Sequence, residues 1–346
     1  MFYYDRGAQH GASDEAAAIA AAHRVLVYYF PSQKSDLDGK YTFSMASVAA
    51  NASAKAAGIS VGEAAADALI AARTGDGLEA SVPYLPGSEP GVWQPTPPGF
   101  LPPAAPWLAH LRPFTLESPS QFRPGGPLAL SSEEWVADFN VTRLFGELNS
   151  SLRTPKQTEV GLFWTEHPPQ QYARAWNYLI KNYRLDLMDS ARLLAILWTS
   201  GADSLIGCFD AKYKFGFWRP VTAIAAGGAN PELAAHAAWL PLGITPNHPE
   251  YPAAHACATS AFSNSVKNFF GTPKVHVVVD SVIFKDGVHT HSFEDTREWA
   301  DEVFWARIFV GFHFIHSLRD GTTLGEQVSR RVNRTAFQSV RRTPDR

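Results

Sequence analysis

The chain has 346 residues, of which 45% are apolar and 12% aromatic, enough to build a large hydrophobic core. A formal net charge of -3 argues against a general nucleic-acid-binding protein, because such proteins carry an excess of basic charge. Two cysteines exclude a disulfide framework, and no run of 18 apolar residues predicts a membrane-spanning helix. We expect a soluble protein without nucleic-acid or membrane partners, compatible with a homo-oligomer. The chain shows no signal peptide, so its compartment stays open.

Residues 13–75 are predicted to be helical. Ser13 can cap a first Ala-rich helix that Pro31 ends, and a second helical tract follows. Ser60 and Glu63 have the spacing of a capping box, which predicts the start of a third helix there.

Residues 83–127 contain 13 of the 25 prolines, which excludes helix over most of the segment. A flexible linker between two domains is one interpretation. We prefer an ordered extended wrap, because the segment also carries several large aromatic residues that would be costly to leave in water.

Residues 132–335 form the predicted catalytic helical part. Helices are expected to start at Ser132 and at Thr154, where Gln157 completes a capping box. Further helices are expected over residues 172–183, 189–210, 231–239 and 255–270, with the prolines at 168 and 169 as a break. A last long helix would carry Arg307.

A β-hairpin is predicted near residues 275–293, with Asp286-Gly287 as its two-residue turn. We expect it to cover the site rather than to build the core. The fold class is therefore mainly α, with the packing of a helical bundle, one small hairpin and a Pro-rich wrap, in a single domain spanning residues 1–346.

Two cations, Lys212 and Arg219, lie seven residues apart in the segment KYKFGFWRP. Two later segments add His255, in the first turn of a helix, and Arg307 with His313. On an ideal helix Arg307 and His313 would point about 120° apart, so their convergence requires a bend near Gly311. Three cations suit a tetrahedral oxyanion, and imidazole can carry a proton, act as a nucleophile or bind a metal.

These segments resemble the superfamily of vanadium-dependent haloperoxidases and type 2 phosphatidic acid phosphatases. Its signature is Lys, six residues, Arg-Pro; then Pro-Ser-Gly-His; then Ser-Arg, five residues, His, with an Asp four residues later. The matching residues are Lys212, Arg219, Pro220, Pro252, His255, Arg307 and His313. Departures from the signature are Ala253, Ala254, Ala306 and Ser317.

The flanking sequences DAKYKFGFWRPVTAI and TPNHPEYPAAHA are similar to the soluble haloperoxidase-like branch of this superfamily. That resemblance covers most of the chain from about residue 13. Members of the branch carry further helices upstream, which would make this chain an N-terminally truncated form.

The resemblance implies a role for each matched residue. The oxygens of vanadate, or of phosphate, would be bound by Lys212, Arg219, Arg307 and the backbone N–H of Ala254. His313 would be the axial vanadium ligand or the phosphorylated nucleophile, and His255 the acid/base. Without an Asp at position 317, His313 needs another orienting partner, with Ser317, Asp320 or a backbone carbonyl as candidates.

The leading functional hypothesis is a vanadate-dependent haloperoxidase that uses hydrogen peroxide to oxidise a halide or a small organic substrate. The first alternative is an acid phosphatase that uses the same pocket for phosphate. A non-catalytic anion-binding protein is the third, because the second and third motifs are altered.

Overall fold

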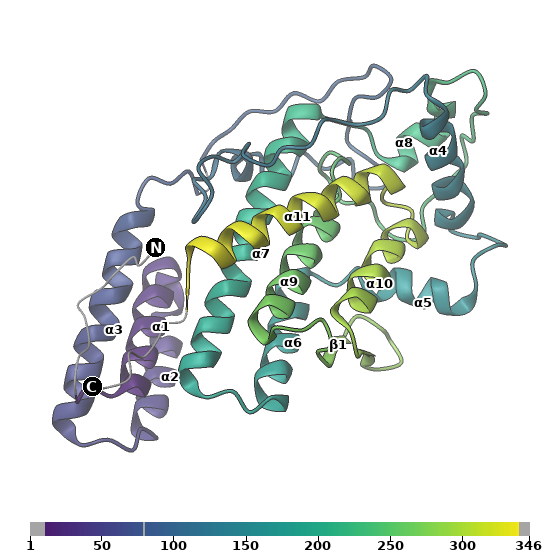
Figure 1. Ribbon diagram of the computed structural model, residues 1–346. Helices are drawn as coiled ribbons and strands as arrows, with labels where there is room; N and C mark the ends of the chain where they lie inside the picture. Colours follow the sequence, from purple (N-terminus) through teal and green to yellow (C-terminus); the bar gives the residue numbers. More distant parts are fainter. Residues whose placement is uncertain (1–10, 79, 339–346) are drawn as a thin grey trace. The chain divides into compact units, whose positions relative to one another are not determined.

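The computed structural model describes residues 11–78 and 80–338, and it is mainly α-helical with one two-stranded sheet (Figure 1). This confirms the predicted fold class. The chain forms two compact units. One consists of Met1–Asp76 with Asp186–Asp189, the other of Gly77–Leu185 with Ser190–Arg346. The single-domain organisation stays a prediction.

The first unit contains α1 (Asp14–Tyr29), a 3-10 turn (Pro31–Gln33), α2 (Lys34–Ala46) and α3 (Ala52–Arg73). Ser13 caps α1 as expected, since its hydroxyl accepts from the Ala16 N–H. The expected capping box at Ser60 is wrong. Asn51 caps α3 instead, accepting from Ala54 N at 2.8 Å, so Ser60 lies inside a helix that has already begun.

The Pro-rich segment of the second unit is an ordered extended wrap, as predicted. Its only regular element among the described residues is the 3-10 helix Pro106–His110. Trp93 is completely buried, and its N–H donates to Gly216 O at 2.7 Å. Farther along, the N–H groups of Phe114 and Thr115 donate to the buried carboxylate of Asp203. These long-range bonds hold the wrap against the helices.

The rest of the second unit is a helical bundle. Its helices are α4 (Glu133–Gly146), α5 (Pro155–Phe163), α6 (Pro168–Asn182), α7 (Leu187–Phe215, without its first three residues), α8 (Pro220–Ala225), α9 (Ala254–Phe270), α10 (Thr296–Phe309) and α11 (Ile315–Thr335), with a 3-10 turn at Gly227–Ala229. Ser132 and Thr154 cap α4 and α5 as predicted. The prolines at 168 and 169 open α6 instead of breaking the chain, because proline is favourable in the first turn.

The helix expected over residues 231–239 is absent from the described structure. Residues there form turns, and the His236 N–H donates to Ile224 O of α8 at 2.9 Å. Because this backbone N–H is bonded outside the segment, it cannot form a hydrogen bond within a local helix.

Helix α9 is the central element of the bundle, packed against α10 and α11 (Figure 1). Small residues let α9 and α11 approach closely. A Cβ on Gly325 would lie 2.2 Å from Cys257 O, and one on Gly321 would lie 2.8 Å from Ala253 O. Hydrogen bonds between buried hydroxyl groups also join the helices. The Ser265 hydroxyl of α9 bonds the hydroxyls of Ser200 in α7 and Ser329 in α11, each at 3.0 Å.

The hairpin consists of β1 (Val277–Ser281) and β2 (His289–Phe293), which are antiparallel. Its position is predicted correctly, but the two-residue turn is wrong. The last paired residues are Ser281 and His289, so residues 282–288 form a longer loop. The expectation that the hairpin covers the site rather than building the core is wrong, since Val277 and Val279 are buried in the main apolar cluster.

Helix α7 is long and apolar enough to cross a membrane, although no run of 18 apolar residues predicts this from the sequence. Of its most apolar 18-residue window, 61% is buried inside the protein, as in the core helix of a globular bundle. The helix delivers Lys212 in its last turn.

Replacing Gly325 with Ala is expected to lower the free energy of unfolding by about 1 to 3 kcal/mol, because the added methyl overpacks the α9–α11 contact. Gly39→Ala is the matched control. Gly39 lies inside α2 with open space around it, so the same change should stabilise by up to about 1 kcal/mol. Urea titration of both variants measures the difference, and equal effects would contradict the close packing of these helices.

Candidate active site

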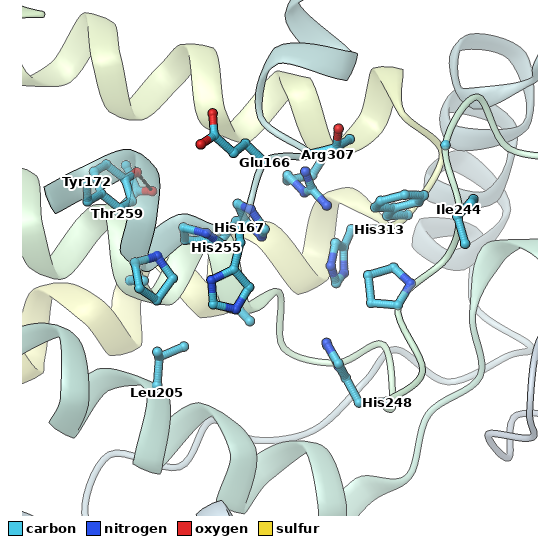
Figure 2. Close-up of a pocket in the computed structure, with 18 of the residues that line it drawn as sticks. Glu166, His167, Tyr172, Leu205, Ile244, His248, His255, Thr259, Arg307 and His313 are labelled. Atoms are coloured by element: carbon cyan, nitrogen blue, oxygen red, sulfur yellow. Dashed lines mark hydrogen bonds between the residues drawn. The ribbon is translucent and has the colours of Figure 1, made fainter. Parts of the chain in front are cut away.

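A cavity of about 660 Å³ lies in the second unit (Figure 2). Its lining includes His255 and Ala254 from the start of α9, Arg307 from α10, and His313 from the turn before α11. Figure 2 shows His313 between Arg307 and His248. The structure thus brings three of the sequence-predicted side chains to one cavity.

The turn at Gly311 brings Arg307 and His313 together. Gly311 has a φ of +78°, and the Phe312 N–H donates to Arg307 O at 3.1 Å. A Cβ at this position would lie 2.5 Å from Gly146 O. Glycine is therefore required both by the left-handed backbone and by the close neighbour.

Lys212 is completely buried and is not among the residues that line the cavity. Its ammonium group donates to Pro249 O at 2.8 Å and to Glu250 O at 2.9 Å. Burial lowers the pKa of this ammonium to about 8, so it is still mostly protonated at pH 7.

Arg219 occupies the N-cap position of α8 and is likewise completely buried. Its guanidinium donates to His248 O at 2.8 Å and to Phe312 O at 3.0 Å. Nη1 also lies 3.3 Å from His313 Nε2. Lys212 and Arg219 hold the cavity's main chain in place, and neither is among the residues that line the cavity.

Arg307 is 1% exposed and lines the cavity directly. Its Nη1 donates to Trp164 O at 2.8 Å, whereas its Nε is buried without a hydrogen-bond partner among the described residues. The guanidinium lies over the Phe312 ring, 4.9 Å from the centroid. Burial, and then the charge of Arg219, lower the pKa of Arg307 to about 9.

His313 makes the most informative contact of the site. Its Nδ1 lies 2.7 Å from Oε1 of Glu250, which also accepts the Phe314 N–H at 3.2 Å. We infer from these partners that Nδ1 carries the proton and that Nε2 is the acceptor nitrogen, with Arg219 Nη1 as its donor in this structure. Burial, followed by the nearby cations, holds the pKa of His313 well below its usual range.

Glu250 is therefore the orienting partner of His313. The expected partners, Ser317, Asp320 or a backbone carbonyl, are therefore wrong. Asp320 bonds the Tyr251 hydroxyl and His316 instead. Burial raises the pKa of Glu250 to about 7.

His255 lies in the first turn of α9, as predicted. Its Nε2 is buried without a hydrogen-bond partner in the described part of the chain. Burial, and then the charge of Arg307, hold the pKa of His255 well below its usual range. The imidazole is therefore neutral at pH 7.

The start of α9 adds backbone donors. The N-cap is Ala253, whose methyl group cannot cap the helix, and Ala254 lines the cavity. Ala253 itself is buried among apolar residues and is not in the cavity lining. A serine hydroxyl at position 253, which the superfamily motif has, would here enter an apolar cluster.

The charges of the site fit a tetrahedral oxyanion. Lys212, Arg219 and Arg307 are buried, and none of them forms an ion pair with a carboxylate among the described residues. Buried cations that no carboxylate pairs directly are costly, and Arg307, which lines the cavity, has an Nε without a hydrogen-bond partner among the described residues. An anion bound beside His313 would offset the charge of these cations and would accept a hydrogen bond from Arg307.

Glu166 also lines the cavity but is already paired, because its carboxylate accepts from Arg174 Nη2 at 2.7 and 2.8 Å. His248 lines the cavity with its Nδ1 3.0 Å from Arg219 Nη2. Sequence reasoning missed both His248 and Glu250, although they lie in the segment TPNHPEYPAAHA that carries the resemblance.

Comparison with known proteins identifies relatives. Residues 192–342, which contain all seven matched motif residues, match the family model described as the VCPO second helical-bundle domain. A curated relative is the vanadium chloroperoxidase of Curvularia inaequalis, 28% identical over 149 residues. That alignment covers 36% of this chain and 24% of the relative, so it spans about a quarter of the relative's length.

Solved structures share the fold. A bacterial vanadium-dependent iodoperoxidase superposes with a TM-score of 0.75 at 22% identity, covering 92% of this chain and 78% of that chain. A holo-type bacterial vanadium-dependent chloroperoxidase gives a TM-score of 0.70 at 17% identity, with 91% and 80% covered. The resemblance to vanadium-dependent haloperoxidases is confirmed. At these identities the structural likeness shows the haloperoxidase fold alone.

Arg307→Ala is expected to weaken the binding of orthovanadate at least tenfold. A hydrogen bond to a charged group contributes about 1.5 to 3 kcal/mol, and about 1.4 kcal/mol corresponds to a factor of ten. Isothermal titration calorimetry measures the change. Arg297→Ala is the control on the same helix, since Arg297 is 72% exposed and paired with Asp295. Unchanged affinity in Arg307→Ala would rule out this site.

Replacing Glu250 with Leu is expected to lower the free energy of unfolding by about 2 to 6 kcal/mol. It leaves His313 Nδ1–H and the Phe314 N–H without an acceptor, and each unsatisfied buried donor costs about 1 to 3 kcal/mol. Glu250→Gln keeps an acceptor oxygen, so its free energy of unfolding should fall by less than half as much. Chemical denaturation compares the two, and equal losses would show that these bonds do not hold His313.

Proposed function

We propose that the protein is a vanadate-dependent haloperoxidase, which oxidises a halide with hydrogen peroxide. The observation that carries the proposal is His313. Its Nδ1 is bonded to Glu250, and the residue lines the cavity together with the buried Arg307. The buried cations Lys212 and Arg219 donate to main-chain carbonyls of residues 248–250 beside it. This donor set suits a trianionic metal oxyanion that takes one nitrogen ligand.

The cations would neutralise the oxyanion. Arg307, with its unpartnered Nε, is the side chain best placed to donate to the anion's oxygens. Lys212 and Arg219 would act on the anion mainly by charge, because their donors already hold carbonyl oxygens. A helix N-terminus at Ala254 would add backbone N–H groups and a positive dipole end.

Glu250 would set the basicity of His313. A carboxylate that accepts from Nδ1–H raises the electron density at Nε2 and holds the ring in one orientation. Nε2 of His313 is the nitrogen that would bond to vanadium.

When bound, vanadate supplies Lewis-acid activation of peroxide. The overall reaction converts H2O2, a halide ion and one proton into a hypohalous acid and water, so the site must handle a proton. His255, with its free Nε2, would hold that proton at the cavity. A bound anion would raise the pKa of this imidazole from its low value, because a nearby negative charge favours the protonated form.

Acid phosphatase activity is the second candidate, and the Glu250–His313 bond also favours it. A carboxylate that orients an imidazole is the arrangement of a nucleophilic histidine, and phosphate has the shape and charge of vanadate. Non-catalytic anion binding is the outcome left if neither activity is found.

Two parallel assays separate these functions. The purified protein would be given peroxide, bromide or iodide and orthovanadate, and separately p-nitrophenyl phosphate. We expect vanadate-dependent halide oxidation. Hydrolysis of the ester that vanadate inhibits would favour the phosphatase, and vanadate binding with neither activity would favour the non-catalytic protein.

His313→Ala is expected to lower the rate of halide oxidation at least 100-fold, because it removes the nitrogen proposed to bond to vanadium. His276→Ala is the control, since His276 lies outside the cavity and pairs with Glu294. That variant should keep its rate within about threefold, as surface substitutions usually do. A His313→Ala protein with the control's rate would contradict the assignment.

A further inference from the structure

Trp164 holds Arg307 from outside the cavity lining. It follows the last residue of α5 and is completely buried. Its carbonyl oxygen accepts from Arg307 Nη1 at 2.8 Å, and it is the hydrogen-bond acceptor that Arg307 has among the described residues. The position of the Arg307 guanidinium in the cavity therefore depends on where the Trp164 main chain lies.

The main chain of Trp164 also reaches His255. Burial and the charge of Arg307 hold the pKa of His255 well below its usual range, whereas a hydrogen bond to the Trp164 backbone acts in the opposite direction. One residue outside the cavity thus contacts both the anion-binding side chain and the proposed proton carrier.

The indole ring of Trp164 is fixed by a second contact with α10. Its Nε1–H donates to Oε1 of Glu302 at 3.0 Å. Glu302 and Arg307 are five residues apart on this helix, so α10 holds Trp164 through both the side chain and the main chain. A buried indole N–H needs an acceptor, so loss of the Glu302 oxygen would leave Trp164 free to shift.

The β-hairpin fixes Glu302 in turn. The hairpin lies beside α10 in Figure 1, and Nδ1 of His291 lies 2.6 Å from the same Oε1 of Glu302. A carboxylate can only accept, so Nδ1 carries the proton of this bond. The His291 ring also stacks on Phe163, the neighbour of Trp164, with 3.8 Å between the ring centroids. The hairpin therefore contacts both the acceptor of the indole and the residue before it.

We propose that Trp164, Glu302 and His291 are positioning residues for the oxyanion site, and that they act on a bound anion through Arg307. This rests on the proposed function, because it requires an oxyanion in the cavity. None of the three residues lines the cavity. Removing the carboxylate of Glu302 favours anion binding by charge alone. Weaker anion binding without Glu302 therefore indicates a lost position and not a lost charge.

The first test measures orthovanadate binding by isothermal titration calorimetry, without peroxide or halide. Glu302→Leu should raise the Kd at least about fivefold, because Arg307 loses a fixed partner. Glu302→Gln keeps an acceptor oxygen for the indole, so its Kd should stay within about twofold of the unmodified protein. Asp301→Leu removes the same charge from the adjacent, exposed position of α10 and should leave the Kd unchanged or lower it. Equal Kd values in Glu302→Leu and Asp301→Leu would overturn the proposal.

The role of the hairpin is tested in the same way. His291→Leu removes one of the two donors that hold Glu302 and should raise the Kd at least about twofold. His289→Leu is the matched control, since His289 lies on the same strand but pairs with Glu159 and Asp286. Its Kd should not change. Equal Kd values in these two variants would overturn the part assigned to His291.

A double-mutant cycle separates positioning from general damage to the fold. If Glu302 acts through Arg307, Glu302→Leu should raise the Kd by less than about twofold in the Arg307→Ala background. A full fivefold loss there would overturn the proposal and leave the oxyanion site in place. Unchanged orthovanadate affinity in Arg307→Ala alone would overturn the oxyanion site itself, and the proposed function with it.

Discussion

The structure around the cavity depends on the burial of three cations without carboxylate pairs. Lys212, Arg219 and Arg307 are each at most 1% exposed, so their N–H groups must find acceptors inside the protein. They find main-chain carbonyls. The acceptors are Pro249 O, Glu250 O, His248 O, Phe312 O and Trp164 O. Because these carbonyls belong to three separate segments, the cations tie the cavity walls together.

The burial of these three cations without carboxylate pairs also explains why the site favours an anion. Carbonyl oxygens satisfy hydrogen bonds but neutralise little charge, so a net positive field stays in a region of low dielectric. Glu250 is the carboxylate that orients His313, and its raised pKa shows that burial opposes its charge. A bound oxyanion would supply the missing negative charge and an acceptor for Arg307 Nε.

Close packing of α9 and α11 places the histidines. Gly321 and Gly325 allow the approach, and the N–H of Ala253 donates to Ser317 O at 3.1 Å where the two helices begin. Ser317 and Ala253 occupy the positions at which the superfamily motif has Asp and Ser. In this chain the two positions pack and hydrogen-bond to each other, while Glu250 bonds to the imidazole.

Sequence alone determined most of the helices and the cationic motif. Caps at Ser13, Ser132 and Thr154 act through neighbours within three residues, and the fixed spacing of Lys212 and Arg219 is visible in one segment. Only the tertiary structure decided which groups meet. Glu250 bonds His313 from 63 residues away, and it lies in a turn that has no periodicity to interpret. The cavity's apolar wall joins α5, α6, α7 and α9, and such long-range packing leaves no local signal in the sequence.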